Sequence, residues 1–464
     1  MTLIRSISGI RGTIGGAPGD GLTPMDAVKY TAAFCWFIQE KSGNRNPHIV
    51  LGRDARISGP ALSDLVRSTL QFLGSRVTDI GLTTTPTTEM AVIALNADGG
   101  IILTASHNPR EWNALKLLNA KGGFLSAEDG AQVLSIAEKE SYRFAAIDNI
   151  GKCETRTDML EYHIQKILEL KLVDKEAITR RKFRVVVDAV NSSGGIAIPQ
   201  LLKALGVNDI ICLNCEPTGH FAHNPEPLPQ HLTEISELIR SQGADLGIVV
   251  DPDVDRLALV CEDGNMFGEE YTLVAVADYV LRHKGGPTVS NLSSTRALRV
   301  ITEKAGYIYQ SAAVGEVNVV EKMKEIQAVV GGEGNGGVIF PELHYGRDAL
   351  VGIALFLSHL AQSGLKTSEL RKTYPNYSIS KNKIDLKPGT DINPLFEEMT
   401  RRYKHLPHST IDGLKIEFDD EWVHLRPSNT EPIIRVYAES TTEDKAQALA
   451  SKIIDEIYSL TRNH

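Results

Sequence analysis

The chain has 464 residues, of which 42% are apolar, so it is long enough for about three or four domains with cores of their own, and intrinsic disorder is excluded. Its net charge of −9 argues against non-specific binding of nucleic acid, and no apolar run approaches the length of a membrane span. The N-terminus lacks the apolar stretch of a signal peptide, and five cysteines are too few and odd in number for a disulfide framework, so we expect a cytoplasmic protein.

The first part of the chain predicts alternating helices and strands. Apolar periodicity with an early proline predicts a helix over 24–39, an apolar run predicts a strand over 48–54, and a second helix is expected over 58–74. Strands are also expected over 183–188 and 288–291, each followed by a similar polar loop. This loose recurrence at about a hundred residues indicates three related α/β units.

Two short segments of the first predicted unit carry candidate site residues. Arg11 stands among glycines and can reach a phosphate, although an ordinary surface arginine is the alternative. A buried strand over 99–104 runs into Ser106 and His107 just before a proline, which places a hydroxyl and an imidazole for chemistry unless the segment is an ordinary turn. Lys116 supplies a cation that can lie near the same loop and transfer a proton if its pKa is lowered.

The next segments are less specific. The charged stretch 171–182 is expected to be a loop. Cys212 and Cys215, followed by His220 and His223, resemble a zinc-binding pattern, but the histidines are too close for the usual spacing. We therefore expect two reduced cysteines near the end of a strand.

A cluster of carboxylates follows a predicted strand over 246–250. Asp251, Asp253 and Asp255 stand two residues apart, and such closely spaced like charges repel one another unless a cation offsets them. All these ligands are hard oxygens, which favours Mg²⁺, or Mn²⁺ in its place. A solvated acidic turn is the alternative, whereas an EF-hand is disfavoured because Arg256 stands where that motif needs glycine.

A glycine run covers 331–337 and formally contains the dinucleotide-binding pattern. That pattern needs a helix after it, but the segment 338–341 is β-like and ends in proline, so we disfavour a dinucleotide site. Glu333 and Asn335 among the glycines suit the binding of sugar hydroxyls instead. A strongly apolar helix is expected over 348–360.

The composition changes at about residue 367, where we expect a separate α+β unit. Short helical and strand patterns surround a tight loop that combines a bidentate cation, hydroxyl groups and backbone donors, which is typical of a phosphate cradle. An ordinary turn with one exposed arginine is the alternative. The candidate phosphate-binding residues are Arg426, Ser428, Asn429 and Thr430, with Arg435 in support.

Taken in this order, the four loops resemble those of the α-D-phosphohexomutase superfamily over nearly the whole chain. The resemblance implies that Ser106 is a phosphorylated nucleophile and, with the three aspartates, a ligand of Mg²⁺. It further implies that Arg256 orients phosphate, that Lys116 and His107 are the acid and base, and that Arg11 is an active-site cation. Glu333 and Asn335 correspond to the sugar loop of that family.

Some positions depart from the pattern of the family. Pro252 and Val254 stand where many members have glycine, Asn335 where many have serine, and Gly337 where many have histidine. These departures concern the sugar and leave the chemistry unchanged. The loop around Arg426 resembles phosphomannomutase/phosphoglucomutase members, whereas the glycine run resembles members that act on glucosamine phosphate.

The resemblance implies three related α/β mixed-sheet domains and a C-terminal α+β domain around a central cleft. It implies a mutase that exchanges hexose 6-phosphate and hexose 1-phosphate through a hexose 1,6-bisphosphate, with one Mg²⁺ per chain. Glucosamine phosphate is the expected substrate, and mannose or glucose phosphate the alternative; a metal-dependent phosphatase and a non-catalytic sugar-phosphate sensor stay open. We expect a monomer or homodimer without membrane or nucleic-acid partners, and domains over 1–152, 153–255, 256–366 and 367–464.

Overall fold

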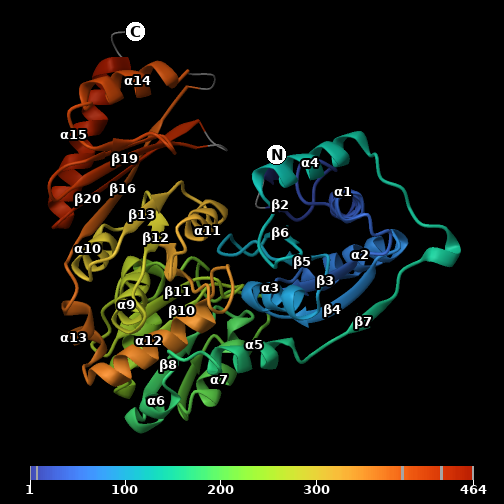
Figure 1. Ribbon diagram of the computed structural model, residues 1–464, viewed down its shortest axis with the longest axis horizontal. Helices are drawn as coiled ribbons and strands as arrows, with labels where there is room; N and C mark the ends of the chain where they lie inside the picture. Colours follow the sequence, from blue (N-terminus) through green and yellow to red (C-terminus); the bar gives the residue numbers. More distant parts are fainter. Residues whose placement is uncertain (1, 7–8, 388–390, 429–431, 462–464) are drawn as a thin grey trace.

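The computed structural model describes residues 2–6, 9–387, 391–428 and 432–461. Four β-sheets follow one another along the chain, and Figure 1 shows them as an N-terminal unit on one side, two closely packed middle units, and a C-terminal unit at the far end. Within the described residues, no helix is long and apolar enough to cross a membrane.

The first sheet has seven strands, covered on both faces by helices. Helices α1 (Pro24–Ser42), α2 (Gly59–Phe72) and α4 (Ala127–Lys139) share one apolar core with the sheet, and α3 (Thr85–Ala94) packs in a second, smaller core. In spatial order, the strands are β1 (Ile4–Ser6), β2 (Gly9–Thr13), β6 (Trp112–Asn119), β5 (Gly99–Leu103), β3 (His48–Arg53), β4 (Arg76–Leu82) and β7 (Cys153–Thr155).

The second and third sheets have four strands each and repeat one arrangement. In each sheet three strands run parallel, and the third along the chain is paired with an antiparallel neighbour. In spatial order, the second sheet has β9 (Asp209–Leu213), β8 (Arg184–Asp188), β10 (Leu246–Val250) and β11 (Leu257–Cys261), and the third has β13 (Tyr309–Ala312), β12 (Thr288–Asn291), β14 (Val330–Glu333) and β15 (Gly337–Ile339).

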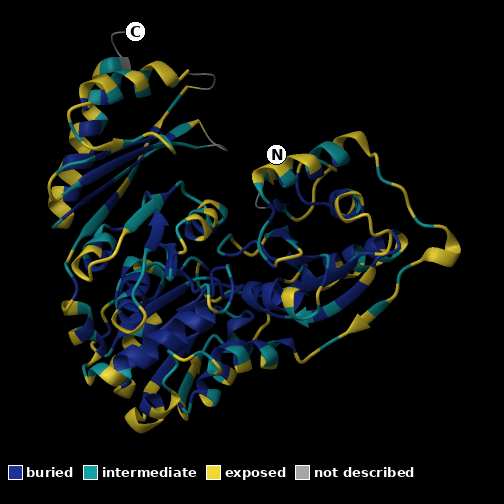
Figure 2. Cartoon of the chain, viewed as in Figure 1, coloured by how far each residue is buried: buried dark blue, intermediate teal, exposed yellow. Residues whose placement is uncertain are grey.

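The same order appears inside the first sheet as β4, β3, β5 and β6, with the last pair again antiparallel. The expected recurrence of three related mixed-sheet units is therefore confirmed. One apolar core is continuous from the second sheet to the third, and Figure 2 shows this region as the most extensively buried part of the chain. The helices of these two units are α5 (Met159–Leu168), α6 (Lys175–Arg181), α7 (Gly194–Ala204), α8 (Thr233–Gln242), α9 (Glu269–His283), α10 (Ala297–Lys304), α11 (Glu316–Glu325), α12 (Ala349–Ser363) and α13 (Thr367–Lys372), with a 3₁₀ turn at Pro229–His231 and another at Ile147–Asn149 before β7.

The fourth unit is an antiparallel sheet with two helices on it, as expected for an α+β unit. Its strands, in spatial order, are β16 (Ser378–Asp385), β20 (Ile433–Ser440), β19 (Trp422–Pro427), β18 (Leu414–Glu417) and β17 (His408–Ser409), and its helices are α14 (Asn393–Arg402) and α15 (Glu443–Thr461).

Two local expectations differ from the structure. The segment 171–182, expected to be a loop, contains α6, because Asp174 accepts a hydrogen bond from the backbone N–H of Ala177 at 2.9 Å and caps a helix too short to show its period. The glycine run is also not a loop throughout, because Gly331 to Glu333 belong to β14. The four domain boundaries stay predictions. The expected division after residue 255 falls between β10 and β11, which pair in one sheet.

Candidate active site

Ser106 lies at the turn that follows β5. Its φ is +48°, in the left-handed region, where a residue other than glycine is uncommon and is kept by its surroundings. The Ser106 N–H donates to Thr104 Oγ1 at 3.0 Å, and the side chain is largely buried. The turn therefore presents one fixed hydroxyl group at the carboxyl end of a parallel strand.

Arg56 holds this turn from beneath. Its guanidinium is fully buried and pairs with Asp54, whose carboxylate also accepts from the Thr104 hydroxyl at 2.7 Å. All five guanidinium N–H groups find acceptors in the loop and its surroundings. The acceptors are Asp54 Oδ2 at 3.1 Å and the carbonyl oxygens of Ser106 (2.6 Å), Asn108 (2.7 Å), Pro109 (2.7 Å) and Trp112 (2.8 Å).

The aspartate loop faces Ser106 across the boundary between the first and second units. The Ser106 hydroxyl donates to Asp251 Oδ2 at 2.7 Å, although the two residues are 145 positions apart. Asp251 Oδ1 accepts the backbone N–H groups of Asp255 and Arg256, each at 3.2 Å, which fixes the loop. The predicted nucleophile and the predicted metal ligands thus share one place.

This aspartate trio fits a hard divalent cation. Asp251, Asp253 and Asp255 are buried, and ligand oxygens of all three lie within 4.8 Å of one another. The outer oxygens Asp253 Oδ1 and Asp255 Oδ1 are buried without a hydrogen-bond partner, which is costly unless a cation binds them. Burial, followed by the neighbouring carboxylates Asp255 and Asp253, raises the pKa of Asp251 well above its usual value.

Lys116 and His107 both lie beside this cluster. Lys116 Nζ donates to Asp253 Oδ2 at 2.7 Å and lies 3.7 Å from Asp255 Oδ2. Burial lowers the pKa of Lys116, but the two carboxylates outweigh burial and raise it to about 12. His107 Nδ1 lies 3.4 Å from the Ser106 hydroxyl oxygen, and burial, aided by nearby arginines, lowers the pKa of His107 to about 2. Lys116 is therefore an ammonium group here, and His107 is neutral.

All four units contribute to one cleft of about 650 Å³. Arg11 lines it from β2, and its Nε atom is buried without a hydrogen-bond acceptor, as expected of a cation that awaits an anion. Arg426 and Arg435 lie directly opposite each other on β19 and β20, and both line the cleft. Like charges in directly opposed positions destabilise a sheet; Asp412, 3.4 Å from Arg426 Nε, offsets part of this charge, and a bound anion would offset more. Ser106, His107, Lys116, Arg256, Glu333 and Ser428 complete the predicted residues on its wall.

Three other predicted residues do not contribute in this way. The side-chain oxygen of Asn335 accepts the backbone N–H of Gly337 at 3.3 Å, and Asn335 is not among the residues that line the cleft. Asn429 and Thr430 lie outside the described residues. Elsewhere, Cys212 lies on β9 and Cys215 just beyond its end, both as free thiols.

Arg347 is the main cleft residue that sequence reasoning missed. Its guanidinium contacts Asp255, Glu333 and Glu316, and its pKa is raised well above the usual value because these carboxylates outweigh burial. The only local signal was its position directly before Asp348, the residue that caps α12.

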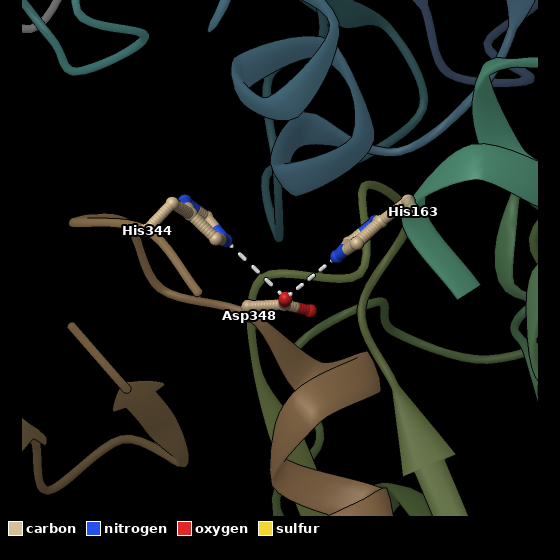
Figure 3. A group of neighbouring side chains, drawn as sticks. All are labelled: His163, His344 and Asp348. Carbon is tan, nitrogen blue, oxygen red and sulfur yellow. Dashed lines mark hydrogen bonds and ion pairs between the residues drawn. The ribbon is translucent and has the colours of Figure 1, made fainter. Parts of the chain in front are cut away.

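Behind the cleft lies a second buried cluster, drawn in Figure 3. The imidazoles of His163 and His344 point from opposite sides at Asp348 Oδ2, at 2.9 and 3.3 Å. The other nitrogen of His344 lies 3.2 Å from Glu89 on α3. Burial lowers the pKa of His344, but Asp348 and Glu89 outweigh it and raise this pKa to about 10. The cluster joins α3, α5 and the start of α12, and so connects all three α/β units.

Comparisons with known proteins agree with this architecture. The sequence models for phosphoglucomutase/phosphomannomutase α/β/α domains I, II and III match residues 3–144, 161–264 and 268–377, and the model for the C-terminal domain matches 383–456. A phosphoglucomutase/phosphomannomutase of Thermococcus kodakarensis is 37% identical over 96% of this chain and 98% of its own length. A probable phosphoglucosamine mutase of Methanopyrus kandleri is 32% identical over 97% of this chain and 96% of its own. The crystal structure of a phosphoglucomutase/phosphomannomutase family protein from Burkholderia thailandensis superposes with a TM-score of 0.85 at 25% identity, covering 99% of this chain and 98% of that one.

Proposed function

The chain belongs to the phosphoglucomutase/phosphomannomutase family and is a phosphohexomutase, and from this premise we propose that it interconverts glucosamine 6-phosphate and glucosamine 1-phosphate. Mannose and glucose phosphates are the second candidates, because the Thermococcus kodakarensis relative, 37% identical, carries the name phosphoglucomutase/phosphomannomutase. The observation that supports the chemistry best is the contact of Ser106 with Asp251 at 2.7 Å in a cleft built by four units.

Ser106 is the proposed carrier of the transferred phosphoryl group. A hydroxyl oxygen of the sugar attacks the phosphorus, and the bond between phosphorus and Ser106 Oγ breaks. The products are a sugar bisphosphate and a free serine side chain. The pKa of Lys116 is raised and not lowered, so Lys116 is placed to return a proton to Ser106, and neutral His107 is placed to take the hydroxyl proton. The reverse transfer, from the other phosphate of the bisphosphate, restores phosphoserine and releases the isomer.

Asp251, Asp253 and Asp255 would hold the Mg²⁺, together with an oxygen on Ser106. When bound, this ion supplies positive charge that offsets the charge of the transferring phosphoryl group. Arg256 and Arg11 add fixed positive charge along the same wall of the cleft.

The far phosphate of the sugar is assigned to Arg426 and Arg435, with Ser428 beside them. Glu333 is placed to accept hydrogen bonds from the hydroxyl groups of the sugar. With one phosphate held at the far end, the hydroxyl at the near end lies in line with Ser106, which removes most of the entropy cost of the encounter.

The experiment is to follow purified enzyme with glucosamine, mannose and glucose 6-phosphates in parallel by phosphorus NMR, with intact-mass analysis of the protein. We expect isomerisation that is fastest for glucosamine phosphate, and loss of both activity and phosphoprotein in Ser106→Ala. The exposed Ser241, replaced by alanine, is the control. Full turnover by Ser106→Ala would contradict the assignment of the nucleophile.

The same experiment separates the alternatives. Steady release of inorganic phosphate without isomer would identify a phosphatase that uses the same aspartate trio. Binding of the sugar phosphate without any conversion would identify a sensor.

A further inference from the structure

The guanidinium group of Arg347, which lines the cleft, donates hydrogen bonds to three carboxylates from separate parts of the chain. Arg347 Nη2 donates to Asp255 Oδ2 at 2.7 Å, Nη1 donates to Glu333 Oε2 at 2.8 Å, and Nε donates to Glu316 Oε2 at 3.0 Å. Asp255 belongs to the aspartate loop, Glu333 is the last residue of β14 and opens the segment here called the sugar loop, and Glu316 is the first residue of α11. All three carboxylates are at least nine-tenths buried, where an unpaired charge is costly, and Arg347 is the cation that contacts all three. Asp255 also has Lys116 at 3.7 Å.

The backbone that carries Arg347 is fixed by the cluster of Figure 3. Asp348 follows Arg347 directly, and its Oδ1 accepts two backbone N–H groups of the first turn of α12 at 2.8 and 3.3 Å. Asp348 Oδ2 lies within hydrogen-bonding distance of the Nε2 atoms of His163 and His344, as Figure 3 shows. In addition, the Arg347 N–H donates to Glu316 Oε1 at 3.0 Å. The guanidinium therefore extends from a rigid base.

The Arg347 side chain packs closely against Gly337. A Cβ atom at Gly337 would lie 2.4 Å from Cδ of Arg347, closer than side-chain carbons approach, and 3.0 Å from Cγ. The backbone of Gly337 has no positive φ, so a larger residue there would act by displacing the Arg347 side chain. The Arg347 side chain can therefore occupy its position because residue 337 has no side chain.

We propose that Arg347 is a positioning residue for the phosphosugar site, because it holds the aspartate loop and the sugar loop in register. This proposal rests on the proposed function and deepens it. Arg347 takes up Asp255 Oδ2, whereas Asp255 Oδ1 has no hydrogen-bond partner and lies 3.9 Å from Arg256 Nε, so this oxygen stays available to a cation. By pairing with Glu333 and Glu316, it also removes two negative charges from the wall that a phosphate dianion must approach.

The test compares Arg347→Met and Arg347→Lys with the wild type in two measurements, KM and kcat for glucosamine 6-phosphate and calorimetric binding of that sugar phosphate in MgCl₂. Arg347→Met leaves three buried carboxylates without their shared cation and should displace the segments that carry them, so KM and the dissociation constant should rise at least about tenfold. Arg347→Lys keeps the positive charge but loses the planar set of guanidinium donors, so its KM and dissociation constant should lie between those of the wild type and Arg347→Met. Arg371→Lys is the matched control, because Arg371 makes its hydrogen bonds to Phe267 and Asn376, away from the cleft.

Two further variants separate positioning from a loss of folding. Gly337→Ala keeps every charge but displaces the Arg347 stem, so it should raise KM in the same direction. Glu316→Gln in the Arg347→Met background removes an uncompensated carboxylate and should restore part of the lost affinity, which a purely structural role would not produce. Wild-type KM and affinity in both Arg347→Met and Gly337→Ala would overturn the proposal. Absence of mutase activity in the wild type would instead refute the proposed function, while calorimetry would still test Arg347.

Discussion

Replacement of Arg56 by methionine should disable the nucleophile loop although it replaces no residue that contacts substrate. The side chain has no exposed surface, and its five N–H groups are all used, one by Asp54 and four by backbone carbonyl oxygens of the Ser106 loop. Methionine fills much of the same space but donates nothing. The substitution therefore removes the charged partner of a buried carboxylate and one donor from each of four carbonyl groups.

The size of the effect follows from these contacts. Breaking a buried ion pair by removing one partner costs about 3–5 kcal/mol, and the carbonyl groups add to this cost unless water reaches them. Some of the cost is relieved if the loop moves, but a displacement of about 1 Å at a reacting group lowers the rate about a hundredfold. Arg56→Lys retains at most three of the five donors and should give an intermediate loss.

The assay combines thermal unfolding with kcat and the fraction of phosphorylated protein. For a unit of this size we expect the first unfolding transition of Arg56→Met to fall by about 6 °C or more, and kcat to fall at least about a hundredfold. Arg67→Met is the control, because Arg67 is partly exposed on α2 and its pairs with Asp64 and Asp79 lie away from the nucleophile loop, the first of them at the surface and worth little. If Arg56→Met melts and turns over like Arg67→Met, the guanidinium does not hold the loop and the reasoning is wrong.

Two further predictions concern the far end of the cleft and the cluster behind it. Arg426→Ala removes a charge-assisted contact worth about 1.5–3 kcal/mol, so KM for the sugar phosphate should rise about ten- to a hundredfold, whereas Arg401→Ala on the exposed face of α14 should not change it. An unchanged KM in Arg426→Ala would place the phosphate elsewhere. For the cluster, Asp348 and Glu89 raise the pKa of His344 to about 10, above the unfolded value of about 6.5, so its stabilisation is complete below pH 6.5 and is lost as pH rises through about 10. The wild-type unfolding midpoint should decline over that window, and His344→Gln should flatten the decline; equal slopes would contradict the assignment.

The fold could be predicted from the sequence wherever the signal is local. Apolar runs that end in polar residues identified β3, β5, β8 and β10, because buried parallel strands are mostly apolar and stop where their carboxyl ends meet solvent or ligand. Helix α6 was missed, because seven residues with two buried side chains give too short a period to recognise. The spacing of Asp251, Asp253 and Asp255 could be read directly, because all three ligands lie in one loop.

Other parts of the site could not be predicted, because their partners lie far along the chain. The pair of Arg347 with Asp255 spans 92 residues, and that of His163 with Asp348 spans 185. Arg56 looked like any charged residue after a strand, and its role depends on four carbonyl groups about 50 residues later in the chain.

By itself, the sequence determined which loops carry reactive groups, because strand ends, turns and carboxylate spacing are set by neighbouring residues. Only the tertiary structure decided which of those groups meet, and which buried arginines hold them. The physical reason is that an isolated loop leaves its charges in water at little cost. Once three units pack together and exclude water, each buried carboxylate and guanidinium must find a partner, and those partners are chosen by the packing of the units.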